Sequence, residues 1–287
     1  MPAPRARPAG PSIALALGGG GARGLAHIPM LEVFDELGVR PVALAGTSMG
    51  ALVAASYASG LSGKAVHELV TATLADRRGL FGRLMEARAG RLTDLFAGLG
   101  NPVLIDAEAF CALFLPSELA RTFDDCAIPL TVSATDFYGR REVVFSQGPL
   151  LPALAASMAI PGLVRPMLQG ETVLVDGGAI NPLPLDHLAG KADAVVAIDV
   201  TGGPSRPPAT GRDGPPGPWD TMFGTLQILQ GAIVAEKLIR FPPDILIRPN
   251  VDLFRALDFQ QASVIFRLAQ PARDELKRAL AALLERL

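Results

Sequence analysis

The sequence predicts an α/β fold around a mostly parallel central sheet, and two observations carry this prediction. Residues 12–17 are expected to be a strand because the apolar residues that follow Ser12 run without interruption into glycines, and apolar side chains then recur at helical spacing over residues 22–37. The same order repeats, since a buried run at residues 42–45 leads through a glycine-framed turn to an alanine-rich helix at residues 49–59. Repeated units of strand, turn and helix are typical of parallel sheets, whose strands are joined by crossover helices.

The rest of the chain adds further strands and one apolar helix. Two strand-like runs joined by a polar, glycine-containing turn predict a hairpin, and shorter apolar runs complete a sheet of five or six strands. Leucines near the C-terminus share one helical face, which core packing explains. These elements are expected at residues 129–137, 142–146, 172–175, 194–200, 245–247 and 271–287.

Composition gives no support to several classes of function. The 287 residues are 49% apolar, which suffices for a buried core, and the net charge of −2 gives no reason to expect nucleic acid as a partner. Cys111 and Cys126 form neither a disulfide framework nor a metal-binding spacing. We therefore expect a reduced protein without metal or cofactor, and the sequence leaves its oligomeric state open.

Three segments define the expected domain organisation. Residues 1–11 are expected to be a disordered tail ahead of a single domain that spans residues 12–287. Residues 64–115 combine helical leucines with arginines, so they form either a lid or membrane-touching surface or ordinary helices with a solvated outer face. Glycines and prolines crowd residues 202–218, which are therefore expected to be a mobile loop.

No transmembrane segment is expected from the sequence. The uncharged window at residues 41–63 is long enough to span a bilayer, but it contains four glycines and few large aliphatic side chains. A cytoplasmic location, with peripheral membrane contact as an option, is the simplest expectation.

The first motif that could carry chemistry is Gly46-Thr47-Ser48-Met49-Gly50, which lies between a predicted strand and a predicted helix. A nucleophile must stand clear of the sheet on such a turn, and the two flanking glycines remove β-carbons that would collide there. The following helix also directs its amide groups and positive dipole end toward developing charge. Ser48 is thus a candidate nucleophile; alternatively, it only caps the helix.

A second glycine-rich turn, Gly18-Gly19-Gly20-Gly21-Ala22-Arg23-Gly24, follows the first predicted strand. Its consecutive backbone N–H groups could stabilise an oxyanion, with each well-placed donor contributing on the order of 3 kcal/mol. The glycines also match the G-x-G-x-x-G pattern of dinucleotide-binding sites. That interpretation expects an acidic residue at the end of the second strand, where the chain instead carries Gly46-Thr47-Ser48. Arg23 could hold the loop in shape or bind an anionic headgroup.

Asp176 is the candidate base. It ends an apolar strand, and the two glycines that follow, Gly177 and Gly178, would let another backbone approach closely. The chain holds three histidines, none in a pattern that marks it as the base: His27, His67 and His187.

Together these three motifs resemble those of the patatin-like phospholipase family, and they occur in the same order along the chain. Family members carry a G-G-G-x-R/K-G oxyanion loop, a G-x-S-x-G nucleophile turn and a D-G-G/A motif with a catalytic aspartate. Residues 156–162 and 181–184 extend the similarity, which covers residues 12–200. Ser157, within the first of these stretches, is assigned a structural role.

The resemblance implies a three-layer α/β/α sandwich and a Ser-Asp dyad without histidine. Ser48 would be the nucleophile and Asp176 its general base. A free carboxylate is a weak base for a hydroxyl, so the dyad needs partial burial to raise the pKa of the aspartate. The resemblance also implies an oxyanion hole at Gly19, Gly20 and Gly21, and supporting positions at Arg23, Gly24, Gly46, Gly50, Gly177 and Gly178.

One position departs from the family pattern. Where members often read H-I-G-V-L after the glycine loop, this chain reads His27-Ile28-Pro29-Met30-Leu31. A proline beyond the first helical turn removes a backbone hydrogen bond, so we expect a disturbed helix at Pro29.

The resulting hypothesis is a serine hydrolase of lipid acyl esters that forms an acyl-serine intermediate. Its substrate would be a phospholipid, a lysophospholipid or another acyl ester, and residues 64–115 and 219–241 are the candidates for interfacial docking. Two alternatives stay open. One is acyl transfer by the same serine, for which His187 is the partner to test, and the other is a non-catalytic nucleotide-binding or regulatory module.

Overall fold

An eight-stranded mixed sheet lies at the centre of the part of the chain that the structure describes. The computed structural model describes residues 10–76, 105–204 and 215–287. The strands are β1 (Ile13–Leu17), β2 (Ala43–Thr47), β3 (Leu130–Asp136), β4 (Arg141–Phe145), β5 (Met167–Gln169), β6 (Thr172–Asp176), β7 (Ala194–Ile198) and β8 (Ile245–Ile247). The α-helices are α1 (His27–Glu36), α2 (Met49–Ala58), α3 (Gly63–Ala75), α6 (Ala107–Ala112), α7 (Leu150–Ser157), α8 (Pro218–Arg240) and α9 (Ala262–Leu284). Short 3-10 helices are η1 (Gly21–Ala26), η2 (Gly177–Ala179), η3 (Leu185–Leu188) and η4 (Phe259–Gln261).

The strands follow the order β5-β6-β3-β2-β1-β7-β8, with β4 paired to β3. The run from β3 to β8 is parallel, whereas β4, β5 and β6 pair antiparallel. The predicted α/β class is therefore confirmed, and β3 with β4 forms the predicted hairpin. All seven segments expected as strands form strands, so the stated count of five or six was too low. The eighth strand, β5, was not expected, because it is only three residues long and shows no alternation in the sequence.

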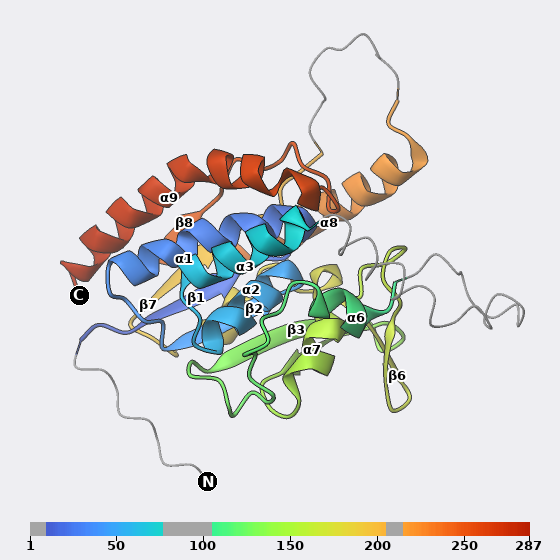
Figure 1. Cartoon of the computed structure of the whole chain (residues 1–287), viewed down its shortest axis with the longest axis horizontal. Helices are drawn as coiled ribbons and strands as arrows, with labels where there is room; N and C mark the ends of the chain where they lie inside the picture. The colour runs from blue at the N-terminus through green and yellow to red at the C-terminus, as the bar shows by residue number, and fades with distance from the viewer. Residues whose placement is uncertain (1–9, 77–104, 205–214) are drawn as a thin grey trace, which may run out of the picture.

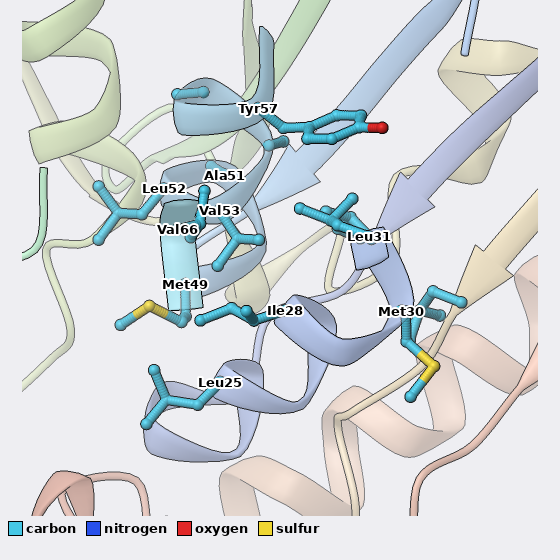
Figure 2. Packing of buried hydrophobic residues seen from close by; sticks show 14 of the residues in the cluster. Leu25, Ile28, Met30, Leu31, Met49, Ala51, Leu52, Val53, Tyr57 and Val66 are labelled. Carbon is cyan, nitrogen blue, oxygen red and sulfur yellow. The ribbon is translucent and has the colours of Figure 1, made fainter. Parts of the chain in front are cut away.

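Side chains of the central strands alternate between two cores. The odd-numbered residues of β1 enter a large cluster under α1, α2, α3, α6, α7 and α9, whereas the alanines of β1 face a smaller cluster. The second cluster is closed by η3 and by Val234 of α8. Figure 1 shows α1 and α3 in front of the strands with α9 beside them, and Figure 2 shows side chains of the large cluster, including Ile28 and Met49. Burial on both faces agrees with the three-layer sandwich that the resemblance implied.

The first predicted helix is divided into two parts. η1 follows the glycine loop, and α1 begins only at His27, so Pro29 lies in the first turn of α1. The first amides of an α-helix have no partner within the helix, and Pro29 therefore costs no hydrogen bond. The disturbance expected at Pro29 takes the form of this junction between two helix types.

The C-terminal helix is longer than predicted. We expected it at residues 271–287, but α9 begins at Ala262 and contains Pro271. Proline is favourable at the start of a helix, which made Pro271 a plausible first residue. Upstream, however, Ile265 and Phe266 are buried in the same large cluster. Their packing outweighs the roughly 3 kcal/mol that an internal proline costs.

Several expected segments fall partly outside the described residues. Within the stretch 64–115, the structure describes α3 and α6, and residues 77–104 lie outside it. Within the expected loop 202–218, residues 205–214 lie outside the description, and Pro218 already belongs to α8. The expected N-terminal tail is described only from residue 10. Among the helices that are described, none is sufficiently long and apolar to cross a bilayer.

One edge of β3 brings the ends of two strands together. β2 pairs in parallel with the first half of β3, so that Thr47 lies opposite Ser133. β6 pairs antiparallel with the second half, so that Asp176 lies opposite Ala134. β4 pairs with residues of β3 that also pair with β2 or β6, so β4 must lie along the opposite edge of β3. The C-terminal ends of β2 and β6 therefore meet beside β3, and Ser48 follows directly after β2.

Candidate active site

Ser48 occupies the turn between β2 and α2 with its backbone in the left-handed region. Its φ is 55° and its ψ is −127°, a conformation that costs a non-glycine residue on the order of 1–3 kcal/mol. A β-carbon at Gly46 would lie 2.6 Å from the Cα atom of Ala51, and one at Gly50 would collide with the Leu17 carbonyl. Both glycines therefore clear the space that this turn requires.

Asp176 ends β6, and hydrogen bonds hold its backbone on both sides. Its N–H donates to the Ala159 carbonyl at 3.0 Å, and its own carbonyl accepts from the Thr135 hydroxyl at 3.0 Å. Its Oδ1 atom accepts from the Gly178 N–H at 2.7 Å. The remaining carboxylate oxygen, Oδ2, faces Ser48.

The two side chains meet in a short hydrogen bond. Ser48 Oγ donates to Asp176 Oδ2 at 2.6 Å, and both residues are buried. Burial raises the pKa of Asp176 to about 6, against the lowering effect of the hydrogen bonds from Ser48 and Gly178. A carboxylate with a pKa closer to neutrality is a better base at pH 7 than a free one. This pair can therefore accept and return a hydroxyl proton.

Residues 157–159, at the end of α7, contact both members of the pair. The Ser157 hydroxyl accepts the Ser48 N–H at 2.8 Å, and Met158 Sδ lies 3.5 Å from Ser48 Oγ. The Ala159 carbonyl takes the N–H of Asp176. The sequence marked this stretch only by its similarity to the family, and nothing in its spacing indicated these contacts.

The glycine-rich loop lies against Ser48, and its amides differ in what they bind. A β-carbon at Gly19 would be 3.3 Å from the Ser48 β-carbon. The Gly19 N–H donates to the Pro182 carbonyl at 2.8 Å, so this amide holds the loop in place. The amides of Gly20 and Gly21 have no acceptor among the described residues. Of the three glycines expected to line an oxyanion hole, Gly20 and Gly21 thus keep their donors available.

The N-terminus of α2 offers a further donor beside the loop. The Met49 amide opens α2 and has no acceptor within the described part of the chain.

The supporting glycines mark places where backbones approach closely. A β-carbon at Gly24 would lie 2.5 Å from Met49 Cγ, one at Gly177 would collide with β3, and one at Gly178 would lie 2.5 Å from Gln230 Nε2.

Arg23 lies in η1, at the end of the glycine loop, and is only 2% exposed. Its guanidinium points to the Phe254 carbonyl, with a nitrogen–oxygen distance of 3.5 Å. Burial lowers the pKa of Arg23 to about 10, although Asp252 and Asp199 act in the opposite direction. The side chain is therefore still a cation at neutral pH. Of the two roles expected for Arg23, its burial favours holding the loop in shape.

All three histidine rings bind elsewhere than at Ser48 or Asp176. His27 Nε2 donates to the Gly18 carbonyl at 2.8 Å. Burial lowers the pKa of His27 to about 4, although this backbone hydrogen bond acts to raise it, so the ring is neutral at pH 7. The other two rings pair with carboxylates at 2.8 Å each: His67 with Glu32, and His187 with Glu142.

A polar cluster behind the site joins β4, η3 and α8. Glu142, Asp186 and His187 offer atoms within 4.8 Å of one another, as metal ligands would. The Lys237 ammonium group, however, lies 2.7 Å from Asp186. Burial acts to raise the pKa of Glu142. Hydrogen bonds from three side chains, of which the bond from His187 has the largest effect, nevertheless lower this pKa to about 2. The chain's own donors therefore balance this negative charge, and we assign the cluster a structural role.

Comparison with known proteins identifies the family. The family model described as patatin-like phospholipase matches residues 15–189, which is more than half of the chain. This chain belongs to the patatin-like phospholipase family. The matched region runs from β1 to η3 and contains both Ser48 and Asp176.

Relatives of this patatin-like chain include bacterial and fungal proteins. The uncharacterized NTE family protein Rv1063c of Mycobacterium tuberculosis is 36% identical, over 72% of this chain and 56% of its own length. Lysophospholipase NTE1 of Candida glabrata is 26% identical, over 95% of this chain and 16% of its own length. The crystal structure of VipD from Legionella pneumophila covers 95% of this chain and 67% of VipD, with 13% identity and a TM-score of 0.48. The chain thus spans about half the length, or less, of these curated relatives.

The burial of Asp176 predicts a pH-dependent effect on stability. Because the pKa of Asp176 is about 6 in the folded protein and about 4 in an unfolded chain, folding favours its protonated form. Stability is therefore lost as pH rises from 4 to 6, and Asp176→Asn should remove this loss. We expect the variant to unfold with a free energy higher than wild type by on the order of 2 kcal/mol at pH 8, and equal to it at pH 4.

Urea unfolding at both pH values measures the effect. Asp136→Asn is the matched control, because it replaces another buried carboxylate that keeps an arginine partner, Arg141, at 3.3 Å. The control should show no gain at pH 8. A difference between Asp176→Asn and wild type that is the same at both pH values would contradict a raised pKa.

Proposed function

We propose that this chain hydrolyses acyl esters of lipids with Ser48 as the nucleophile and Asp176 as the general base. The observation that carries this proposal is the 2.6 Å hydrogen bond between their side chains in a buried site. Histidine is not needed in this proposal, since each histidine ring has another hydrogen-bond partner. Membership of the patatin-like phospholipase family supports a lipid ester as the substrate.

The proposed reaction begins when Ser48 Oγ attacks the ester carbonyl carbon and its proton passes to Asp176 Oδ2. The carbonyl oxygen becomes an oxyanion, for which we propose as donors the amides of Gly20, Gly21 and Met49, which have no acceptor among the described residues. Asp176 then protonates the leaving alcohol as the carbon–oxygen bond breaks, which leaves an acyl group on Ser48. Water attacks this acyl group while Asp176 takes its proton, and the fatty acid departs as the proton returns to Ser48.

Burial makes an aspartate suitable for both proton transfers. General acid–base catalysis is most effective when the pKa of the catalytic group lies close to the working pH. The pKa of Asp176, at about 6, approaches that condition. The carboxylate also keeps its direction, because Gly178 fixes Oδ1 while Oδ2 receives the proton.

We further propose phospholipids, lysophospholipids or related acyl esters as the substrate class, with α8 as the surface that contacts a membrane. α8 buries only Gly224 and Val234, and residues 221–235 carry no charged side chain. Ile228 and Leu229 are more than half exposed. α8 also approaches the site, since Gln230 contacts the position of Gly178. An uncharged, exposed helix face of this kind suits the boundary between headgroups and acyl chains.

The dyad predicts that Ser48→Ala and Asp176→Asn each lower kcat for a short-chain aryl ester by at least about a thousandfold. Ser56→Ala is the control for the serine change, because Ser56 is equally buried and donates within α2. Labelling with a fluorophosphonate, read by peptide mass spectrometry, should modify wild type at Ser48. A non-catalytic nucleotide-binding module would stay unlabelled, and acyl transfer would give a new ester when an alcohol acceptor is added.

A folded His187→Ala variant should keep its activity within about tenfold of wild type, because His187 lies outside the proposed proton path. Circular dichroism would check that the variant folds. An inactive but folded His187→Ala protein would replace the dyad with a histidine-dependent mechanism. Near-normal turnover by Asp176→Asn would equally contradict the proposal.

The pKa of Asp176 predicts the pH dependence of the reaction. The base must be ionised to accept the Ser48 proton, so kcat/KM should rise with pH through an apparent pKa of about 6 and then level off. Initial rates in constant-ionic-strength buffers from pH 4 to 9 would measure this. The residual activity of Asp176→Asn should lack the transition, and a wild-type curve flat from pH 5 to 8 would contradict the assignment.

The membrane proposal predicts weaker binding to vesicles when Ile228 and Leu229 are both replaced by Asp. Co-sedimentation with phosphatidylcholine–phosphatidylglycerol vesicles should fall by at least about tenfold, because each leucine-sized side chain contributes about 2 kcal/mol to binding when it is buried in the membrane. Hydrolysis of a soluble ester should remain unchanged. Leu287→Asp, at another exposed leucine, is the control. Equal sedimentation of the variant and wild type would exclude α8 as the contact.

A further inference from the structure

Ser157 is a wholly buried serine that uses its hydroxyl in two directions. Its Oγ atom accepts the N–H of Ser48 at 2.8 Å and donates to the Ser133 carbonyl at 2.6 Å. Because the single proton of the hydroxyl is committed to β3, the oxygen lone pair is oriented toward Ser48. Ser157 thus connects the nucleophile turn to the strand that pairs with both β2 and β6.

Ser48 needs such a partner for two reasons. Its left-handed backbone is unfavourable for a residue with a side chain, so the surroundings must hold it there. Its N–H is also buried at the end of a strand, where an unsatisfied donor costs roughly 1–3 kcal/mol. The Ser157 hydroxyl meets both needs, because one hydrogen bond satisfies the donor and fixes the peptide plane of the turn.

We infer that Ser157 is a positioning residue that directs the Ser48 side chain toward Asp176. This inference rests on the proposed function, in which Ser48 is the nucleophile. The residues that follow Ser157 support it, since Met158 contacts Ser48 Oγ and Ala159 binds the N–H of Asp176. One short segment therefore sets the position of the nucleophile relative to its base.

The same hydrogen bond also determines that the Ser48 amide is not among the donors available at the site. The Ser48 N–H is occupied by Ser157, so it is withheld from a developing oxyanion. The neighbouring amides of Met49, Gly20 and Gly21 keep no acceptor among the described residues. Loss of the Ser157 hydroxyl would leave Ser48 free to turn, while the general shape of the substrate site stays as it is. Turnover should therefore suffer more than substrate binding.

The test compares wild type with Ser157→Ala, Ser157→Cys and the control Ser56→Ala, which removes another buried hydroxyl from the neighbouring helix α2. Steady-state hydrolysis of a short-chain aryl ester gives kcat and KM, and hydrogen–deuterium exchange followed by NMR gives the protection of the Ser48 amide. For Ser157→Ala we expect kcat to fall on the order of tenfold to a hundredfold with KM nearly unchanged. The Ser48 amide should exchange at least about tenfold faster.

Ser157→Cys keeps a weaker donor and acceptor at the same position, so its kcat and exchange rate should lie between those of wild type and Ser157→Ala. This variant decides the matter if Ser157→Ala does not fold. Ser56→Ala should match wild type in all three quantities. If Ser157 were merely structural, Ser157→Ala and Ser157→Cys would lower the free energy of unfolding without changing kcat or the protection of the Ser48 amide in the folded protein.

Two results would overturn the inference. One is unchanged exchange of the Ser48 amide in Ser157→Ala, and the other is unchanged kcat in that variant when Ser48→Ala is inactive. The exchange measurement needs no activity, so it separates this inference from the proposed function. If Ser48→Ala were as active as wild type, the proposed nucleophile would be wrong, whereas faster amide exchange would still establish the hydrogen bond as the restraint on the turn.

Discussion

The site depends on one backbone conformation, the left-handed turn at Ser48. A serine in this conformation projects its hydroxyl away from the sheet, but it is held there only by its surroundings. Gly46 and Gly50 remove the side chains that would block the turn, and Ser157 satisfies its buried N–H. The strain of the turn is therefore balanced by the packing of β2, α2 and α7 together. The conformation of Ser48 requires all three elements to be in place.

The second constraint is the burial of a carboxylate that has no cationic partner among the residues that the structure describes. β3 creates it, because β2 and β6 share one of its edges and end against each other. Asp176 is thereby placed next to Ser48 and removed from water, and its pKa rises. The chain pairs other carboxylates with cations, for example Asp186 with Lys237. The fold thus accepts an electrostatic cost at Asp176, which is typical of groups that take part in proton transfer.

Local patterns predicted the central strands, both glycine-framed turns and the Asp176 motif, because glycine turns and apolar runs are properties of neighbouring residues. Other features depend on contacts between distant segments. Ser157 contacts Ser48 across 109 positions of sequence, and only the packing of α7 brings them together. Local patterns also could not predict the hydrogen bond from the Gly19 amide to the Pro182 carbonyl, or the continuation of α9 through Pro271. In each case tertiary packing outweighed the local preference.

The central claim is that Ser48 carries the acyl group during turnover. Rapid mixing of the protein with a p-nitrophenyl ester, followed by acid quench and peptide mass spectrometry, tests it directly. We expect a burst close to one nitrophenol per protein and an acyl mass on the peptide that contains Ser48. Hydrolysis without a burst, and with the Ser48 peptide unmodified at every time of quenching while another side chain carries the acyl group, would contradict it.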